Sequence, residues 1–320
     1  MGLFYGYCFM NHWQKNTRNT LKGADKCNAF FHSEQFEDQN FPIKIPLEFA
    51  NLIDKNNPND PLLKQVLPQI KIEQQGFSIE PLEDEKNSPV AGLIHKYPNR
   101  VLLIASRVCA IHCQYCFRQN FNYSEHDAIS NWQAIEEYIH THPQVNEVIL
   151  SGGDPLSLSD EKLQSLINNI ENIPHIKNLR FHTRSAVVTP SRITTELVKM
   201  LGKTRLHIVL VTHVNHANEL SDKFAEAIGQ LTKVTLLNQS VLLKGVNDSV
   251  SVLSTLSTDL FALGILPYYL HLLDKVSGAE HFLVEDETAT KLHRELGKKL
   301  SGYLVPRLVR DENLAAKTWL

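Results

Sequence analysis

From about residue 101 onward, short apolar runs alternate with longer segments whose apolar residues recur at helical spacing. In one such segment, Leu163, Leu166, Ile167, Ile170 and Ile173 form one apolar face, which predicts an amphipathic helix. Six apolar runs are predicted to be strands: VLLIAS from Val101, EVILSG from Glu147, LRFHTR from Leu179, LHIVLVTH from Leu206, VTLLNQSVLL from Val234 and ILPYYLHLLD from Ile265.

This alternation of strands and helices predicts an α/β fold in which parallel strands are joined by right-handed crossovers. Polar residues follow the strands: the cysteine-rich loop, residues 151–154, Arg184, His213, Gln239 and Asp274. Because active sites of barrels collect at the C-terminal ends of their strands, we expect a partial, open TIM-like barrel of about six parallel β/α units.

The chain is predicted to have three parts. Residues 1–95 contain many prolines and few periodic stretches, so we expect an N-terminal cap there. Residues 96–284 are expected to form the barrel core. Residues 285–320 are expected to form a C-terminal extension, which begins with a helix at about 285–300.

Composition narrows the functional classes only a little. Hydrophobic residues make up 42% and charged residues 21%, as in ordinary globular proteins. A net charge of -3 provides no basic field, so we expect no nucleic-acid partner. No apolar run is long enough to cross a bilayer, and no basic region precedes the apolar start of the chain, so we expect a cytoplasmic protein without a membrane partner.

Three of the five cysteines fall within the segment CAIHCQYC, at Cys109, Cys113 and Cys116. Clustered thiols without a secretion signal indicate metal binding rather than disulfides. Three thiolates would leave one iron of a four-iron cluster open to another ligand, and an open iron can bind S-adenosylmethionine (SAM). The alternative is a zinc site completed by His112 or by a distant histidine.

The C-x3-C-x2-C spacing after a first strand resembles the radical SAM superfamily. The segments CQYCFRQNF, VILSGGDPLSLSD, LLNQSVLLKGVND and PYYLHLLDKVSGAEHF resemble the lysine 2,3-aminomutase family, especially its branch that serves β-lysylation of elongation factor P. The resemblance begins near Asn57. It implies an isomerase that converts L-lysine to (R)-β-lysine and uses a [4Fe-4S] cluster, SAM and pyridoxal 5'-phosphate (PLP).

By this resemblance, Cys109, Cys113 and Cys116 bind the cluster. SAM contacts are implied for the turn after the second predicted strand and for an amide after the fifth: Gly152, Gly153, Asp154 and Gln239. Other readings of these residues remain open. Asp154 followed by Pro155 is also typical of a helix cap, and Gln239 could be a buried, hydrogen-bonded amide.

The resemblance also implies roles for residues at the two ends of the core. Lys317 would form the Schiff base with PLP, although Ala315, Ala316 and Trp319 depart from the usual GKTP-like motif. Lys96, Tyr97 and Arg100 would bind the PLP phosphate, or would form a surface basic turn. The substrate carboxylate is assigned to Arg118, and the side-chain ammonium of lysine to Asp274 and Asp311, because paired acids favour a cation.

The branch implies functional partners: elongation factor P with its lysyl ligase, and a flavodoxin or ferredoxin-like electron donor. A homo-oligomer is compatible with the sequence. Two alternatives remain: a lysine 2,3-aminomutase of catabolism or osmolyte synthesis, and a non-catalytic iron-sulfur or zinc protein. The second alternative gives no function to Lys317, the carboxylate pair or the glycine turn.

Overall fold

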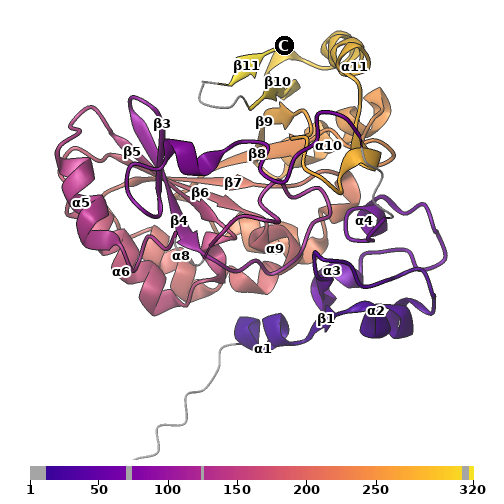
Figure 1. The fold of residues 1–320 in the computed structure, drawn as a ribbon, viewed down its shortest axis with the longest axis horizontal. Coiled ribbons are helices and arrows are strands. Elements are labelled where there is room, and N and C mark those ends of the chain that lie inside the picture. The colour runs from indigo at the N-terminus through magenta and orange to yellow at the C-terminus, as the bar shows by residue number, and fades with distance from the viewer. Residues whose placement is uncertain (1–11, 70–73, 124–125, 312–316) are drawn as a thin grey trace, which may run out of the picture.

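A computed structural model describes residues 12–69, 74–123, 126–311 and 317–320. Its centre is a nine-stranded sheet of order β11-β10-β9-β8-β7-β6-β5-β4-β3 (Figure 1). The strands are β3 (Leu93–Tyr97), β4 (Arg100–Ser106), β5 (Glu147–Gly152), β6 (Asn178–Thr183), β7 (His207–Thr212), β8 (Thr235–Val241), β9 (Leu266–His271), β10 (Arg307–Arg310) and β11 (Thr318–Trp319).

The prediction of an α/β fold with mainly parallel strands is confirmed, since β4 to β9 are the six predicted strands and all pair in parallel. The predicted strand count was too low. A seventh parallel strand, β10, follows β9, and antiparallel β3 and β11 form the two edges. β10 and β11 have four and two residues, too few to show a clear alternation.

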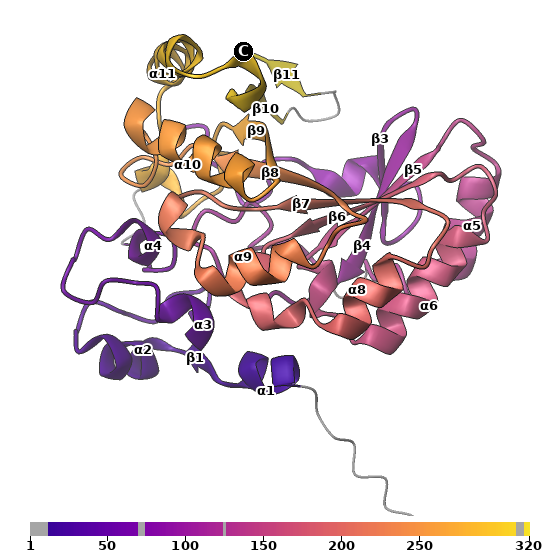
Figure 2. The same ribbon diagram turned by 180° about the vertical axis from the view of Figure 1, so that it is seen from behind.

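Helices cover the outer face of the sheet (Figure 2). They are α5 (Trp132–His140), α6 (Asp160–Glu171), α8 (Thr195–Leu201), α9 (Asp222–Gly229), α10 (Val250–Ala262) and α11 (Asp286–Lys299). The predicted apolar face of α6 is buried, and Ser159 caps the helix by accepting a hydrogen bond from the Lys162 amide. Ile173 is buried as predicted but lies beyond the helix end. The helix expected at 285–300 is α11.

The N-terminal region carries short elements beside the sheet (Figure 1). They are α1 (His12–Arg18), β1 (Thr20–Lys22), α2 (Ala24–Phe31), β2 (Lys44–Pro46), α3 (Leu47–Ala50) and α4 (Pro61–Lys64), and β1 pairs with β2. Backbone hydrogen bonds join this region to the cysteine loop: His112 N donates to Lys44 O at 2.9 Å and Gln114 N to Gln65 O at 2.9 Å. The N-terminal region therefore helps to fix the loop.

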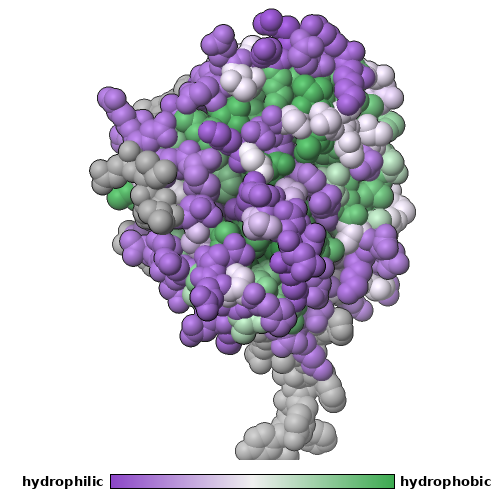
Figure 3. All heavy atoms as spheres, turned by 90° about the vertical axis from the view of Figure 1, so that its right-hand side faces the viewer, coloured by the Kyte–Doolittle hydropathy of each residue, from purple (hydrophilic) through white to green (hydrophobic). Residues whose placement is uncertain are grey.

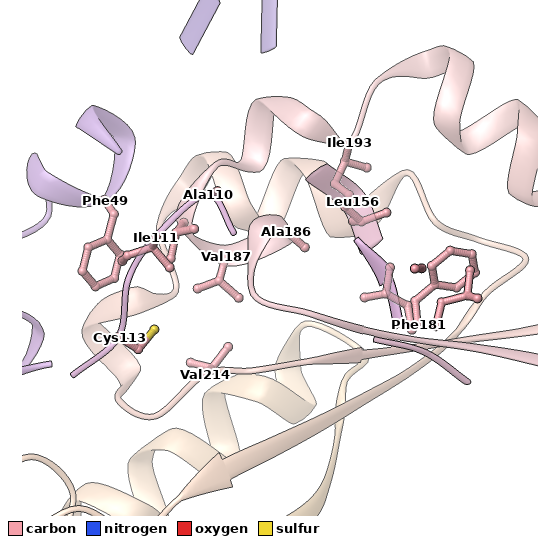
Figure 4. Close-up of a cluster of buried hydrophobic side chains, with 14 of the residues drawn as sticks. Phe49, Ala110, Ile111, Cys113, Leu156, Phe181, Ala186, Val187, Ile193 and Val214 are labelled. Carbon is pink, nitrogen blue, oxygen red and sulfur yellow. The ribbon is translucent and has the colours of Figure 1, made fainter. Parts of the chain in front are cut away.

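The main hydrophobic core is continuous from the N-terminal region through the sheet to its outer helices. Figure 4 shows Phe49, Ile111, Val187 and Val214 around Cys113, so that one thiol of the cysteine loop lies against the core. On the face shown in Figure 3, hydrophilic side chains surround separate hydrophobic areas. Among the described helices, none has the combined length and apolar character required for a bilayer span.

The two edge strands are linked by one contact although they do not pair. The Lys317 amide, beside β11, donates a hydrogen bond to the Tyr97 hydroxyl at the end of β3, at 2.8 Å. These residues belong to opposite edges of the same sheet. The sheet is therefore curved strongly enough to bring its edges together at this point.

Candidate active site

A cavity of about 520 Å³ lies on the inner face of the curved sheet, large enough for cofactors and a small substrate. All of the residues predicted for the site contribute to its lining: Lys96, Tyr97, Arg100, Cys109, Cys113, Cys116, Arg118, Gly152, Gly153, Asp154, Gln239, Asp274, Asp311 and Lys317. The fold thus brings together side chains that are far apart in the sequence.

The cysteine loop follows β4. Cys109 and Cys116 are partly buried and Cys113 is buried, and all three are free thiols. Burial raises the pKa of each thiol, and the other thiols raise the pKa of Cys109 further by repulsion. Three thiolates so close together require a strong positive charge, which an iron cluster supplies when bound. The donor set therefore fits a cluster.

The zinc alternative receives no support from His112. Its Nδ1 lies 2.7 Å from the Pro42 carbonyl oxygen, and its ring stacks on Phe41 with centroids 5.0 Å apart. Throughout the described residues, no three His, Cys, Asp or Glu side chains are grouped to hold a single ion. The thiolates of a four-iron cluster bind different irons, so they surround a volume instead of converging on one point.

The glycine turn after β5 packs directly on the cysteine loop. Gly152 has φ +108°, which favours glycine, and a Cβ on Gly153 would lie 2.7 Å from the Val108 backbone. The amides of Gly153 and Asp154 donate to Ser106 O at 2.7 Å and to Val108 O at 3.0 Å. The glycines are therefore required for backbone contact with the cysteine loop, a reason that the sequence analysis missed.

Asp154 is a cap, as one reading of the sequence proposed. Its carboxylate accepts hydrogen bonds from Leu156 N at 2.9 Å, Arg184 N at 2.8 Å, Ser185 N at 2.7 Å and the Thr183 hydroxyl at 2.8 Å. Burial raises its pKa, and these hydrogen bonds oppose that rise. The carboxylate thus ties the ends of β5 and β6 together beside the cysteines.

A buried polar network lies behind Cys113. Arg184 forms an ion pair with Glu219 at 3.0 Å and donates to Gln65 Oε1 at 2.9 Å. Asn215 donates to the same Gln65 oxygen at 3.0 Å and to the Tyr115 hydroxyl at 2.8 Å. Buried polar groups need such partners, and here they join the cap to the ends of β6 and β7. Of these residues, only Arg184 was identified from the sequence, as a polar residue at the end of a predicted strand.

Several polar groups that line the cavity lack protein partners among the described residues, and Gln239 and His213 are two of them. The side chain of Gln239 makes no hydrogen bond to the described residues. Likewise, His213 Nε2 is buried without a partner among them. A buried polar atom requires a hydrogen bond, so His213 Nε2 fits a polar ligand such as SAM better than an empty cavity, and the half-buried Gln239 side chain lines the same cavity. The alternative reading of Gln239 as an internally bonded amide finds no hydrogen-bond partner among the described residues, and its contact with SAM stays a prediction.

Arg118 is buried two residues after Cys116. Its Nε donates to Asp84 Oδ2 at 2.9 Å and its Nη1 to the Ser151 hydroxyl at 3.3 Å. Burial lowers its pKa, but the charge and hydrogen bond of Asp84 together with Tyr123 and Cys116 outweigh burial and raise the pKa, so the guanidinium stays charged. Asp84 belongs to the short helix η1 (Asp84–Asn87), and the sequence analysis missed it because no motif marks this position.

At the other end of the cavity, Lys317 has acidic and imidazole partners. Its Nζ lies 3.1 Å from Asp311 Oδ2 and 3.2 Å from His271 Nε2. It also lies 4.8 Å from the centroid of the Tyr269 ring. Read alone, a lysine in AAKTWL would be solvated, but its side chain is only 20% exposed. Ala315 and Ala316, the atypical neighbours, lie outside the described residues.

The two carboxylates predicted for substrate binding have opposite pKa shifts. Burial and the charge of Asp311 raise the pKa of Asp274 to about 7. Burial would also raise the pKa of Asp311, but the hydrogen bond from His271 and the charge of Lys317 hold it below its usual range. The pair thus contains one fixed negative charge and one carboxyl that ionises near neutral pH.

The predicted phosphate-binding residues lie on the β3–β4 hairpin. The guanidinium of Arg100 stacks 3.6 Å above the Tyr97 ring, and its Nη1 donates to Asn99 Oδ1 at 3.0 Å. Both residues line the cavity with Lys96, so they are not a turn on the outer surface. Two cations and a hydroxyl on one wall fit the phosphate group of PLP.

The comparisons with known proteins agree with this site. Residues 99–225 match the family model described as a 4Fe-4S single cluster domain. The chain is 49% identical to L-lysine 2,3-aminomutases of Haemophilus influenzae and Escherichia coli, over 85% of this chain and 82% and 80% of theirs. Identity to L-lysine 2,3-aminomutase of Clostridium subterminale is 36%, over 94% of this chain and 75% of the relative. The chain therefore belongs to the L-lysine 2,3-aminomutase family, whose members are radical SAM isomerases with a [4Fe-4S] cluster, SAM and PLP.

Proposed function

We propose that this enzyme is an L-lysine 2,3-aminomutase in which the cavity residues carry the roles inferred from the sequence. Cys109, Cys113 and Cys116 would hold the cluster, and Lys317 would bind PLP through Nζ. The observation that carries the proposal is the single cavity, lined by the three thiols and also by Lys317 with two carboxylates. When bound, the cluster and SAM supply a carbon radical, and PLP supplies a π-system that stabilises the substrate radical.

The chain's own residues would orient L-lysine between these two ends. The planar guanidinium of Arg118, held by Asp84 at 2.9 Å, would pair with the substrate carboxylate. Asp274 and Asp311 would receive the side-chain ammonium at the Lys317 end. A glutamate side chain would be repelled by the same two acids, so the site selects a cationic substrate.

Gln239 and His213 would bind the polar groups of SAM, since both line the cavity and His213 Nε2 is buried there without a partner among the described residues. Gly152, Gly153 and Asp154 would contact SAM as the resemblance implies, and in addition the glycines would hold the cysteine loop and Asp154 would fix the turn. Lys96, Tyr97 and Arg100 would bind the PLP phosphate. With cofactors and substrate bound, the cavity would leave less room for water that could quench a radical.

We also propose that the curved sheet is a partial barrel, an interpretation supported by the hydrogen bond between Lys317 and Tyr97 at its opposite edges. The division into a cap, a core and a C-terminal extension, with boundaries near residues 95 and 285, belongs to the same proposal.

The decisive experiment is an anaerobic assay of reconstituted enzyme with L-lysine, SAM, PLP and dithionite, in which β-lysine and 5'-deoxyadenosine are both measured. We expect both products from the wild-type enzyme and neither from Cys113→Ala. Cys27→Ala is the matched control, since Cys27 is buried away from the cavity. Deoxyadenosine without β-lysine, from a sample with full cluster content, would contradict the substrate assignment.

For the pathway, we propose that the product is (R)-β-lysine and that a ligase attaches it to elongation factor P in the cytoplasm. A flavodoxin or ferredoxin-like protein would supply the electron. This proposal rests on the resemblance to one branch of the family. It predicts that deletion of the gene removes the β-lysyl mass from elongation factor P, and that added β-lysine restores it; an unchanged mass would favour a catabolic or osmolyte role.

A further inference from the structure

His271 is a cavity residue to which neither the sequence motifs nor the proposed function assigns a task. It is the last residue of β9 and is only 8% exposed. Its Nε2 lies 3.2 Å from Lys317 Nζ, and its Nδ1 lies 3.4 Å from Asp311 Oδ2. The imidazole thus stands between an amine and a carboxylate, with one ring nitrogen toward each.

This arrangement suits one tautomer of the neutral ring. With the proton on Nδ1, the ring donates toward Asp311 and turns the lone pair of Nε2 toward Lys317. Burial lowers the pKa of His271, and the charge of Lys317 lowers it further, although Asp311 opposes this. Tyr269 on the same strand, His182 of β6 and His213 just after β7 also face it, and none adds a negative charge at neutral pH.

Lys317 needs such a partner because an ammonium has no lone pair with which to attack an aldehyde. Asp311 lies 3.1 Å from the same nitrogen, but its pKa is held below its usual range, so it stabilises the ammonium and is a poor proton acceptor. Asp311 alone would therefore hold Lys317 in its unreactive form. A neutral imidazole in contact with Nζ can take the proton.

We propose that His271 is the general base that frees the Lys317 amine for bond formation with the PLP aldehyde, and that Asp311 orients its ring. This inference rests on the proposed role of Lys317. In the step, Nε2 takes a proton from the ammonium and the Nζ lone pair forms a bond to the aldehyde carbon. The carbonyl oxygen takes one proton from the amine and one back from His271, and leaves as water.

The test measures the rate of imine formation in protein without cluster or SAM, by the rise in imine absorbance after PLP is added. We expect His271→Ala to react about a hundredfold more slowly than wild type near neutral pH. Added imidazole should restore much of the rate in this variant, because a free base can enter the space left by the ring. The deficit should shrink at high pH, where the amine loses its proton without help.

Two further variants separate chemistry from structure. His271→Gln keeps a hydrogen-bonding side chain of similar length but offers no base, so it should be as slow as His271→Ala. His293→Ala is the matched control, since His293 bonds the Pro306 carbonyl oxygen outside the cavity, and it should react at the wild-type rate without an imidazole effect.

A wild-type rate in His271→Gln, or a slow His271→Ala that imidazole does not accelerate at any pH, would overturn the inference. Failure of the proposed function would look different. In that case the wild-type protein itself would form no imine at Lys317, as judged by borohydride trapping and peptide mass. Normal trapping in wild type together with a normal rate in both His271 variants rejects only the role of His271.

Discussion

The two ends of the cavity are built in different ways. The cysteine end, which comprises the thiols and the Gly152–Gly153 turn, is held by backbone hydrogen bonds between neighbouring strands and by the core. At the lysine end, made of Lys317, Asp311, Asp274 and His271, side-chain contacts predominate, and Lys317 lies beside the two-residue edge strand β11. Because short edge strands have few stabilising contacts, the lysine end is expected to open more easily than the cysteine end.

The structure of the cysteine end thus depends mainly on steric fit, and that of the lysine end depends mainly on charge. A Cβ at Gly153 meets backbone atoms at 2.7 Å, which a side-chain movement cannot relieve. At the lysine end, the raised pKa of Asp274, about 7, means that its charge changes near neutral pH. Substitutions at the cysteine end should therefore act by disturbing packing. Substitutions at the lysine end should have effects that depend on pH.

The largest effect is expected from Gly153→Ala, which tests the steric account of the cysteine end. The added methyl group should displace the Val108 backbone, lower the unfolding free energy by about 1–3 kcal/mol and remove most of the bound iron. Iron analysis, cluster absorbance and denaturant unfolding check this. The control is Gly297→Ala in α11, where an added Cβ meets nothing within 4 Å and should leave iron content unchanged. Equal iron content in the two variants would contradict the steric account.

An intermediate effect is expected from pH at the lysine end. The folded state raises the pKa of Asp274 from 3.8 to about 7, so it binds a proton that the unfolded state releases. Stability contributed by this group is therefore lost as pH rises between these values. Relative to Asp274→Asn, the protein without cofactors should lose at least about 2 °C in Tm on going from about pH 5 to about pH 8.

Thermal unfolding followed in the same buffers for Asp259→Asn provides the control, since Asp259 is exposed on α10. Its Tm should follow that of the wild-type protein at every pH. A constant difference between wild type and Asp274→Asn across the range would mean that Asp274 keeps an ordinary pKa, and that the lysine end is not governed by charge in this way.

The smallest effect is expected from Tyr97→Phe, which removes the hydrogen bond that joins the sheet edges but keeps the ring on which Arg100 stacks. One neutral hydrogen bond contributes about 0.5–1.5 kcal/mol, so PLP affinity should fall about two- to tenfold. Titration with PLP measures this. Tyr303→Phe, at a side chain that is 60% exposed, should bind PLP as the wild type does. If Tyr97→Phe lowers only the overall stability and leaves PLP affinity unchanged, then the Tyr97 hydroxyl does not support PLP binding at the lysine end.

The residues of the cysteine end could be picked out from the sequence as cavity residues because their signals are local: three thiols in eight residues and a glycine turn after a strand. The sequence also predicted the six central strands, whose apolar runs are long enough to be recognised. Asp84 and His271 were missed because their roles come from contacts with Arg118 and Lys317, which lie far away in the sequence. The steric requirement for glycine at position 153 was missed because the sequence does not show that the Val108 backbone packs against this residue in the folded loop.

The contact between Tyr97 and Lys317 also determines when the two ends of the cavity can form during synthesis of the chain. These residues are separated by 220 positions in the chain. At about 5 to 20 residues per second, a ribosome needs roughly ten to forty seconds to pass from one to the other. During that time the cysteine loop and the first strands are already made while the amine does not yet exist. Assembly of the metal centre can therefore precede closure of the cavity, and the lysine end is completed last.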